Sequence, residues 1–387
     1  MIKDYFVKNE QIGKKGRAMI IMDIKADNLF AFKNFHMNMS YPKKIVKSTI
    51  EGEYLSDRPN FRYKKVNILM GSNATGKTTI GKLLMVFANY FNDGETGRFK
   101  ALVDNKKEEA TLVIDFVTSE SYLYRFDLRL KPRLDEEKPE MEAETHIYFT
   151  SINRDDSYEN CALKLDRNEK KETTYEEVDI DGWSFSYPQD AADEVRYKAI
   201  VNNDLYLPIL EAVLKTLDPD IKSVLKLTEV ENTFVIKMRN QSVIVKDGII
   251  VGNNILSSGT KAGIEIAYII ASLTCNMHDL YYCDELFSYV NSDIEKACLS
   301  IIIDRLTDRK QMFFTTHNLE ILDMQLPKHS FVFLKKNVFD EEKPIKCISA
   351  SQYLKRNTDS LKCAVENDLF CTAPDLRELF DIMNLNC

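Results

Sequence analysis

Residues 71 to 78 read Gly71-Ser72-Asn73-Ala74-Thr75-Gly76-Lys77-Thr78 and match the pattern G-x-x-x-x-G-K-[ST]. The glycines let the backbone turn tightly, so that successive N–H groups can point at the phosphate oxygens of a nucleotide. We expect Lys77 to reach the β- and γ-phosphates and the Thr78 hydroxyl to be a ligand of Mg²⁺. A strand predicted over 65–70 and a helix predicted from Thr78, which also contains Thr79, give this phosphate loop the flanking elements that the chemistry needs. All residues from Gly71 to Thr79 are therefore candidate nucleotide contacts.

Two further predicted strands end in side chains that can carry chemistry. One, Leu280–Cys283, is followed by the adjacent carboxylates Asp284 and Glu285. Asp284 suits a position at the metal ion, and Glu285 suits a general base that polarises the attacking water. The other strand, Met312–Thr316, ends in a hydroxyl and is followed by His317. Because open α/β sheets place ligands at the carboxyl ends of their strands, this hydroxyl and this imidazole should face the same crevice as the phosphate loop.

A turn of small residues, Leu256-Ser257-Ser258-Gly259-Thr260, precedes a helix predicted over 261–276. Taken alone, the segment is a helix N-cap that contains a glycine. With its neighbours it resembles the signature motif of the ABC-type ATPases, because phosphate loop, signature, Asp-Glu strand and histidine follow one another in the order of that superfamily. The resemblance implies an α/β fold class: a P-loop NTPase with the ABC-ATPase head, a mixed sheet and an inserted antiparallel β-rich lobe.

The resemblance also implies a mechanism based on a dimer of heads. In ABC-type ATPases two heads enclose two ATP molecules with Mg²⁺, and each nucleotide lies between the phosphate loop of one head and the signature of the other. By position, Ser257 and Gly259, with Ser258 between them, would contact the γ-phosphate of the nucleotide held by the partner subunit. His317 would sense that phosphate, and Ser288–Asp293 would be the loop that crosses the interface. We therefore expect a homodimer or a higher homo-oligomer.

Length and composition set the domain plan. The chain has 387 residues, of which 44% are hydrophobic and 29% charged, which is typical of a folded protein. We expect an ATPase head over 18–330, split by a β-rich insert at about 99–202, and a C-terminal extension over 331–387. Asp+Glu number 60 and Lys+Arg 52, and the resulting net charge of −8 excludes a wholly basic protein that coats nucleic acid. The eight scattered cysteines form no CxxC pair and indicate reduced thiols.

The whole chain is more similar to the stand-alone ATPases of the RecF, SMC and OLD clan than to transporter subunits. Leu256 follows Lys77 by 179 residues (256 − 77), and the intervening sequence is β-rich instead of forming a compact helical lid. The likeness rests on Asn34-Phe35, on Leu217–Ile221 and on Ser258–Lys261. Such ATPases serve in bacterial phage-defence systems, including those of the PARIS and Septu types. None of the six glutamines stands where the family's Q-loop would be obvious, so that role is unassigned: Gln11, Gln189, Gln241, Gln311, Gln325 and Gln352.

Three functions remain open at this point. The first is an ATP-driven sensor or scaffold that regulates a separate effector, a nuclease or a toxin, in anti-phage defence. OLD proteins carry a Toprim nuclease after the ATPase, and the 70 residues after His317 (387 − 317) are short for one, so a nuclease would be another chain. The second is a RecF-like DNA-binding ATPase in DNA repair, which a basic groove would favour. The third, ranked last, is the ATPase subunit of a transporter.

The sequence also bears on the compartment. No apolar run approaches the roughly 18 residues that span a bilayer, and Met1–Arg17 lacks the apolar region of a signal peptide. We therefore expect a cytoplasmic protein that has no membrane partner.

Overall fold

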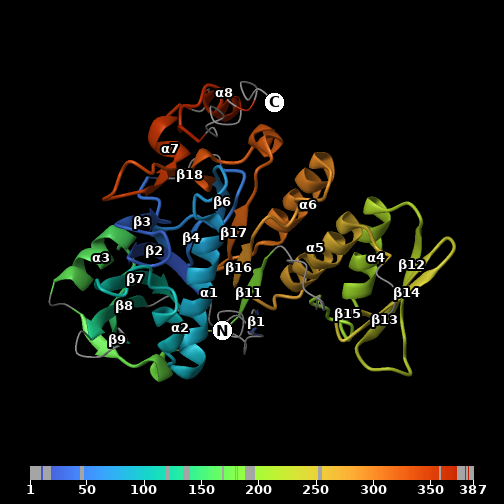
Figure 1. Ribbon diagram of the computed structural model, residues 1–387, viewed down its shortest axis with the longest axis horizontal. Coiled ribbons are helices and arrows are strands. Elements are labelled where there is room, and N and C mark those ends of the chain that lie inside the picture. The colour runs from blue at the N-terminus through green and yellow to red at the C-terminus, as the bar shows by residue number, and fades with distance from the viewer. Residues whose placement is uncertain are drawn as a thin grey trace.

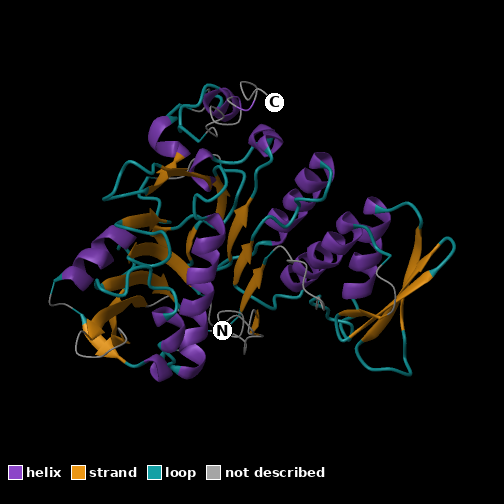
Figure 2. Cartoon of the chain, in the orientation of Figure 1, coloured by secondary structure: helices purple, strands orange, loops and turns teal. Residues whose placement is uncertain are grey.

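The computed structural model describes residues 10–11, 19–43, 48–118, 122–133, 140–167, 170–178, 180, 182–187, 197–251, 255–356, 359–372, 380 and 382. These residues form an α/β head in which helices cover both faces of a central sheet (Figures 1 and 2). An antiparallel sheet lies on one side of the head, and a small lobe of one helix and four strands lies on the other. Within these ranges, no helix combines the length and the hydropathy of a membrane span.

The central sheet is mixed, as the sequence predicts. In spatial order its strands are β1 (Glu10–Gln11), β11 (Trp183–Ser186), β16 (Leu280–Cys283), β17 (Gln311–Thr315), β6 (Val66–Met70), β18 (Phe331–Lys336) and β19 (Ile345–Ser349). The five strands from β11 to β18 run parallel, and the outer strands β1 and β19 pair antiparallel with them. Every residue of β6, β16 and β17 is buried, which is typical of parallel strands covered on both faces.

The second large sheet is fully antiparallel. In spatial order its strands are β10 (Lys171–Thr173), β9 (Glu140–Ser151), β8 (Tyr122–Arg133), β7 (Ala110–Val117), β2 (Ile20–Asp27) and β3 (Phe35–Asn38). The β-rich lobe expected over 99–202 is therefore not self-contained. Its strand β7 pairs with β2, which precedes the phosphate loop in the sequence. Strand β11 also falls within 99–202, but it belongs to the central sheet. The hairpin β4–β5 (Tyr54–Leu55 and Arg58–Arg62) and helix α3 (Tyr158–Asp166) cover the outer face.

Helix α1 (Lys77–Asp93) lies between the two large sheets. Its apolar side chains recur at helical spacing and form one hydrophobic cluster with residues of both sheets. Gly94 ends the helix in the left-handed conformation, with φ 69°, and donates its N–H to the carbonyl of Tyr90 at 2.7 Å. On the opposite face of the central sheet, α5 (Ser258–Thr274) and α6 (Ser292–Arg305) form a second cluster. The phosphate loop thus follows β6, a strand whose two faces are both covered by helices.

The small lobe lies between the antiparallel sheet and the signature turn in the sequence. It contains α4 (Tyr206–Leu217) and the antiparallel strands β12 (Ile221–Lys226), β13 (Thr233–Met238), β14 (Ser242–Lys246) and β15 (Ile249–Val251). The sequence predicts α4 and the β13–β14 hairpin, and the structure adds β12 and β15 on either side. Helix α4 packs on α5 so closely that a Cβ atom on Gly263 would lie 2.5 Å from Cδ1 of Leu217. The lobe is coloured yellow-green at the right of Figure 1.

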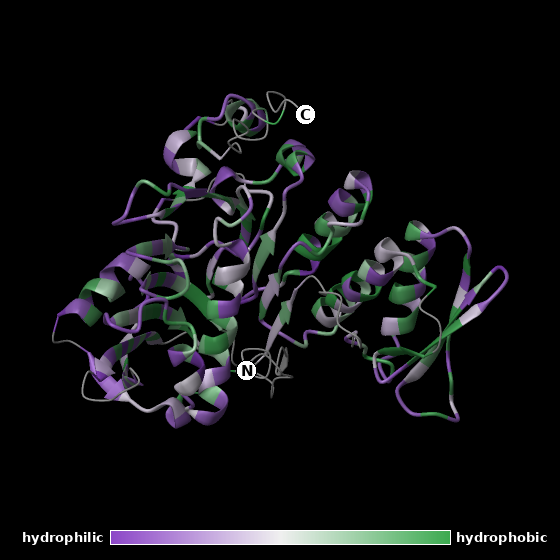
Figure 3. Ribbon diagram, viewed as in Figure 1, coloured by the Kyte–Doolittle hydropathy of each residue, from purple (hydrophilic) through white to green (hydrophobic). Residues whose placement is uncertain are grey.

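The segment after residue 330 contributes to the head. β18 pairs with β6, so a domain boundary at 330 would separate a strand from its own sheet. The short helices α7 (Ala350–Tyr353) and α8 (Leu361–Glu366) follow, and the rings of Phe333 and Phe370 stack there with centroids 4.0 Å apart. Most of the expected extension after 372 lies outside the described residues. Figure 3 shows hydrophobic residues along the central strands and hydrophilic ones at the outer turns.

We expect a substitution at Gly81 of α1 to test this packing. A Cβ atom there would lie 2.4 Å from Cε1 of the buried Tyr282 ring on β16. Gly81→Ala should therefore lower the free energy of unfolding by about 1–3 kcal/mol, measured by urea denaturation. The matched control is Gly97→Ala on α2 (Gly97–Lys100), where nothing lies within 4 Å, and it should be neutral or stabilising. Equal effects of the two substitutions would contradict the close contact between α1 and β16.

Candidate nucleotide-binding site

The phosphate loop has a backbone that its glycines make possible. Gly71 has φ 155° and Gly76 has φ 98°, both in the region that favours glycine. A Cβ atom on Gly71 would lie 2.4 Å from the carbonyl oxygen of Leu334, and one on Gly76 would lie 2.8 Å from Cε1 of Phe32. The loop is thus held between β18 and the segment before β3. Its tip, Asn73 and Ala74, is exposed to solvent.

Lys77 points back into the loop that precedes it. Its ammonium donates hydrogen bonds to the carbonyl oxygens of Gly71 at 2.9 Å and Ser72 at 3.2 Å. Burial lowers the pKa of Lys77, while the charges of Glu285 and Asp284 act in the opposite direction. The ammonium therefore lies inside the loop and within electrostatic reach of the two carboxylates that follow β16.

Asp284 is the centre of a hydrogen-bonded group at the carboxyl edge of the sheet. The Thr78 hydroxyl donates to one carboxylate oxygen at 2.6 Å, and the Thr315 hydroxyl donates to the other at 2.7 Å. Burial raises the pKa of the Asp284 carboxyl, and these two hydrogen bonds oppose that shift. A hydroxyl and a carboxylate so placed are hard oxygen donors, which Mg²⁺ prefers. Thr78 and Asp284 thus fit the predicted metal position.

Glu285 and His317 form a pair beside this group. The Nε2 atom of His317 lies 2.9 Å from a carboxylate oxygen of Glu285. The side chain of Glu285 is 31% exposed and that of His317 is 42% exposed, so water reaches both. Glu285 has φ 47°, and its N–H donates to the Thr315 hydroxyl at 2.9 Å. Thr315 therefore fixes the backbone at Glu285 as well as the Asp284 carboxylate.

The signature turn is built at the start of α5. Ser257 is the N-cap residue, and its hydroxyl accepts a hydrogen bond from the N–H of Thr260 at 3.1 Å. Ser257 and Ser258 are exposed. A Cβ atom on Gly259 would lie 2.9 Å from the carbonyl oxygen of Tyr289, whose side chain is 68% exposed. The signature and the loop expected to cross the interface therefore share one surface.

The structure brings five of the predicted residues together and leaves the signature on a separate helix. Lys77, Thr78, Asp284, Glu285 and His317 meet at the carboxyl edge of β6, β16 and β17. The remaining loop contacts, Ser72, Thr75, Gly76 and Thr79, lie on the same loop or on the first turn of α1. Ser257, Ser258 and Gly259 lie at the start of α5.

The strand register differs from the sequence prediction at one residue. The sequence places the hydroxyl of Thr316 in the crevice. The structure ends β17 at Thr315, and it is the Thr315 hydroxyl that reaches Asp284. Thr316 instead donates to Glu295 on α6 at 3.0 Å, because side chains alternate between the two sides of the chain. Two adjacent threonines after an apolar strand indicate that one hydroxyl reaches the site. Which of the two does so depends on where the strand ends, and the sequence alone does not specify this.

Sequence reasoning also missed a tyrosine and left the glutamine unassigned. The Tyr282 hydroxyl on β16 donates to the carbonyl oxygen of Lys77 at 2.5 Å and so ties the start of α1 to the sheet. Gln311 is buried on β17 and bonds the backbone of Ile21 and Lys64, which is a structural role. Gln189 lies outside the described residues.

Comparison with known proteins gives a fold. No protein-family model and no curated protein matches the chain. An SMC head bound to the C-winged helix domain of ScpA is similar to it over 87% of this chain and 99% of that one, with a TM-score of 0.50 at 11% identity. Two further matches are SMC heads. The SMC head domain from Thermotoga maritima has a TM-score of 0.40 at 14% identity, over 85% of this chain and 98% of that one. A Pyrococcus furiosus SMC head with an extended coiled coil, bound to the C-terminal domain of ScpA, has a TM-score of 0.48 at 9% identity, over 92% of this chain and 100% of that one. The chain therefore has an α/β fold similar to that of an SMC head. More particularly, its structural neighbours are heads of SMC proteins.

Proposed function

We propose that the protein is a Mg²⁺-dependent ATPase of the ABC type whose heads dimerise around ATP. The observation that carries this proposal is the Asp284 carboxylate, which accepts hydrogen bonds from Thr78 at 2.6 Å and Thr315 at 2.7 Å beside the ammonium of Lys77. Lys77 and the loop N–H groups hold the β- and γ-phosphates. Thr78 and Asp284 would hold Mg²⁺, which would supply positive charge against the phosphates. Glu285 takes the proton of the attacking water, and His317 orients Glu285.

The proposal extends to a partner. ATP binding and hydrolysis regulate or scaffold a separate effector, a nuclease or a toxin, in bacterial anti-phage defence in the cytoplasm. The motif-level resemblance to PARIS-type and Septu-type ATPases supports this extension. One structural neighbour, the SMC head, is bound to a separate domain of ScpA, so a head of this fold can hold another protein. The small lobe and the turn with Val338 and Phe339, which are 70% and 89% exposed, offer surface outside the ATP site.

The DNA-binding alternative finds less support on the exposed antiparallel sheet. Lys131 on β8 pairs with Glu144 on β9 at 2.7 Å. Arg133 on β8 likewise pairs with Glu142 on β9 at 3.3 Å. These cations alternate with carboxylates instead of forming the continuous basic stripe that a phosphate backbone requires. We therefore keep DNA binding as the second candidate.

The basic activity is tested with the purified full-length chain. Light scattering after gel filtration should show a shift from monomer to dimer when ATP and Mg²⁺ are added. Phosphate release should occur with Mg²⁺ and stop with EDTA. A chain that releases no phosphate under any of these conditions would refute the ATPase. Co-purification with the product of an adjacent nuclease or toxin gene tests the effector, whereas adjacent permease genes would favour a transporter subunit.

A further inference from the structure

A second polar cavity lies where the edges of the two large sheets meet. It has a volume of about 490 Å³, and its lining includes residues of β3, β19 and α7. The lining also includes Lys64, two residues before the start of β6, whereas the phosphate loop directly follows β6. At about 3.3 Å per strand residue, the seven residue steps from Lys64 to Gly71 span about 23 Å. Lys64 thus lies at the opposite end of β6 from the phosphate loop, and none of the predicted nucleotide contacts lines the cavity.

Lys64 is a buried cation without a carboxylate partner. Its side chain is 5% exposed, and its ammonium donates to one neutral acceptor, the carbonyl oxygen of Asn38, at 2.9 Å. Among the described residues, no ion pair includes Lys64. Burial lowers the pKa of Lys64, and the charges of Cys347 and Glu53 act in the opposite direction. Burial of an ammonium group that has no direct ion pair costs free energy, which an anion in the cavity would recover.

Other lysines of the lining add to this charge. Lys43 and Lys355 are exposed and Lys343 is half-buried, so the cavity has one buried lysine and three that are open to solvent to different degrees. The charges of Lys64 and Lys343 both act to lower the pKa of the Cys347 thiol, which burial raises to about 11. The two ammonium groups therefore lie around the same thiol on β19.

The remaining polar groups of the lining are mostly neutral. Among the described residues of the lining, Glu159 is the only carboxylate, and it accepts a hydrogen bond from the Ser40 hydroxyl at 2.8 Å. The hydroxyls of Ser349 and Ser351 lie 3.1 Å apart and can donate to a ligand. Charge and donors thus favour an anion with several acceptor oxygens.

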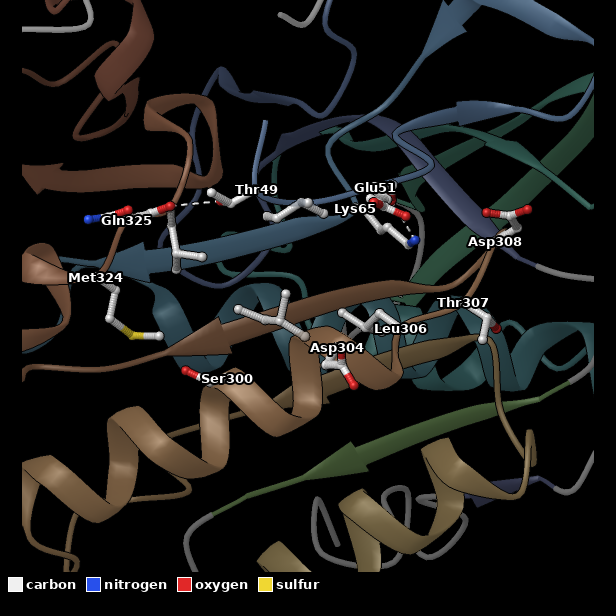
Figure 4. Close-up of a pocket in the computed structure, with 13 residues that line it drawn as sticks. Thr49, Glu51, Lys65, Ser300, Asp304, Leu306, Thr307, Asp308, Met324 and Gln325 are labelled. Atoms are coloured by element: carbon white, nitrogen blue, oxygen red, sulfur yellow. Dashed lines mark hydrogen bonds between the residues drawn. The ribbon is translucent and has the colours of Figure 1, made fainter. Parts of the chain in front are cut away.

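The adjacent lysine provides an internal comparison. Lys65 is also buried, at 2% exposed, and donates to the carbonyl oxygen of Glu51 at 2.7 Å. It lines a different cavity of about 770 Å³, shown in Figure 4, in which Asp304 and Asp308 also lie. The charge of Asp308 raises the pKa of Lys65 against the effect of burial. The charge of Glu53 acts on both lysines, but the two cavities differ: three carboxylate residues line that of Lys65, whereas three further lysines line that of Lys64.

We propose that the cavity beside Lys64 binds the phosphate group of a small phosphorylated molecule. Lys64 and Lys343 contact the phosphate, and the hydroxyls of Ser349 and Ser351 donate to its remaining oxygens. The volume falls in the range of small-molecule sites, about 300–1,000 Å³. A DNA duplex fits less well, because a buried ammonium cannot follow a backbone that runs along the outside of a helix.

Calorimetric titration of inorganic phosphate into the full-length chain tests the proposal. A saturating non-hydrolysable ATP analogue, AMP-PNP, with Mg²⁺ keeps both the β- and γ-phosphate positions of the phosphate loop filled during the titration. We expect one saturable site in the wild type and an affinity about tenfold or more lower in Lys64→Met. Lys343→Met, which changes a half-buried side chain, should weaken binding as well and guards against a folding defect at position 64. Lys65→Met is the matched control and should keep the wild-type affinity.

Three results would overturn the proposal. The first is an absence of saturable phosphate binding by the wild type. The second is the same affinity in Lys64→Met and in the wild type, above all if Lys77→Ala abolishes binding, since phosphate would then occupy the loop. The third is displacement of phosphate by a short DNA duplex in a Lys64-dependent manner, which would assign the cavity to nucleic acid. None of these results bears on ATP hydrolysis, which is measured separately.

Discussion

Replacement of Glu285 by glutamine should abolish ATP turnover while ATP binding survives. The amide keeps the size of the carboxylate but cannot take a proton from the attacking water, so the hydrolysis rate should fall by about 10²–10⁴-fold. Lys77, Thr78 and Asp284 are unchanged, and the variant should therefore accumulate as a closed dimer with ATP. Steady-state phosphate release measures the rate, and light scattering in the presence of ATP and Mg²⁺ measures the dimer.

The control for this variant is a carboxylate that lies outside the site. Glu320, on the short helix η3 (Leu319–Asp323), is exposed and pairs with Lys296 at 3.2 Å. Glu320→Gln should therefore turn over ATP at the wild-type rate. Wild-type turnover by Glu285→Gln would instead show that another group is the general base.

Two inactive variants should restore activity when they are mixed. Lys77→Ala removes the phosphate contact of the loop, and Ser257→Asp places a negative charge where the partner's γ-phosphate is expected. Aspartate is a good N-cap residue, so α5 keeps its hydrogen bond to the Thr260 N–H. In a symmetric dimer with shared sites, half of the mixed dimers are heterodimers with one intact site, and about a quarter of the wild-type rate should return.

The expected recovery depends on the negative charge at position 257 and on ATP sites that are shared between the two subunits. Ser257→Asn is a neutral cap of similar size, and alone it should retain most of the activity. A mixture of Lys77→Ala and Ser257→Asp that stays inactive, although both proteins are folded and form dimers, would mean that each head completes its own site. Phosphate release by the mixture against each variant alone makes the comparison.

The sequence predicts local elements well where one segment determines its own conformation. The phosphate loop needs glycine at 71 and 76, and the structure has positive φ at both positions. The strand Leu280–Cys283 has the predicted bounds, because an apolar β-rich run ends there at two carboxylates. Helix α5 starts at Ser258 instead of the predicted 261, since Ser257 provides the cap. Local chemistry is enough for these features.

Features that depend on distant partners could not be predicted in this way. The pairing of β7 with β2 joins Thr111 to Asp27, far apart in the sequence, and no local pattern specifies it. Asp284 receives hydrogen bonds from both Thr78 and Thr315, which only the order β16-β17-β6 brings together. The side toward which each of two successive threonines points depends on where β17 ends.

In the proposed ATPase, the hydrogen bonds from Lys77 to its own loop mean that nucleotide binding replaces one set of acceptors of the ammonium by another. The ammonium already holds the carbonyl oxygens of Gly71 and Ser72, so the loop keeps its shape before a ligand arrives. A preorganised loop avoids an ordering cost of about 1–2 kcal/mol per residue on binding. On binding, the ammonium would exchange two neutral carbonyl acceptors for charged phosphate oxygens, which form stronger hydrogen bonds. A nucleoside without β- and γ-phosphates offers no acceptors to replace the two carbonyl oxygens. Lys77 would then keep its bonds to the loop and select against such a ligand.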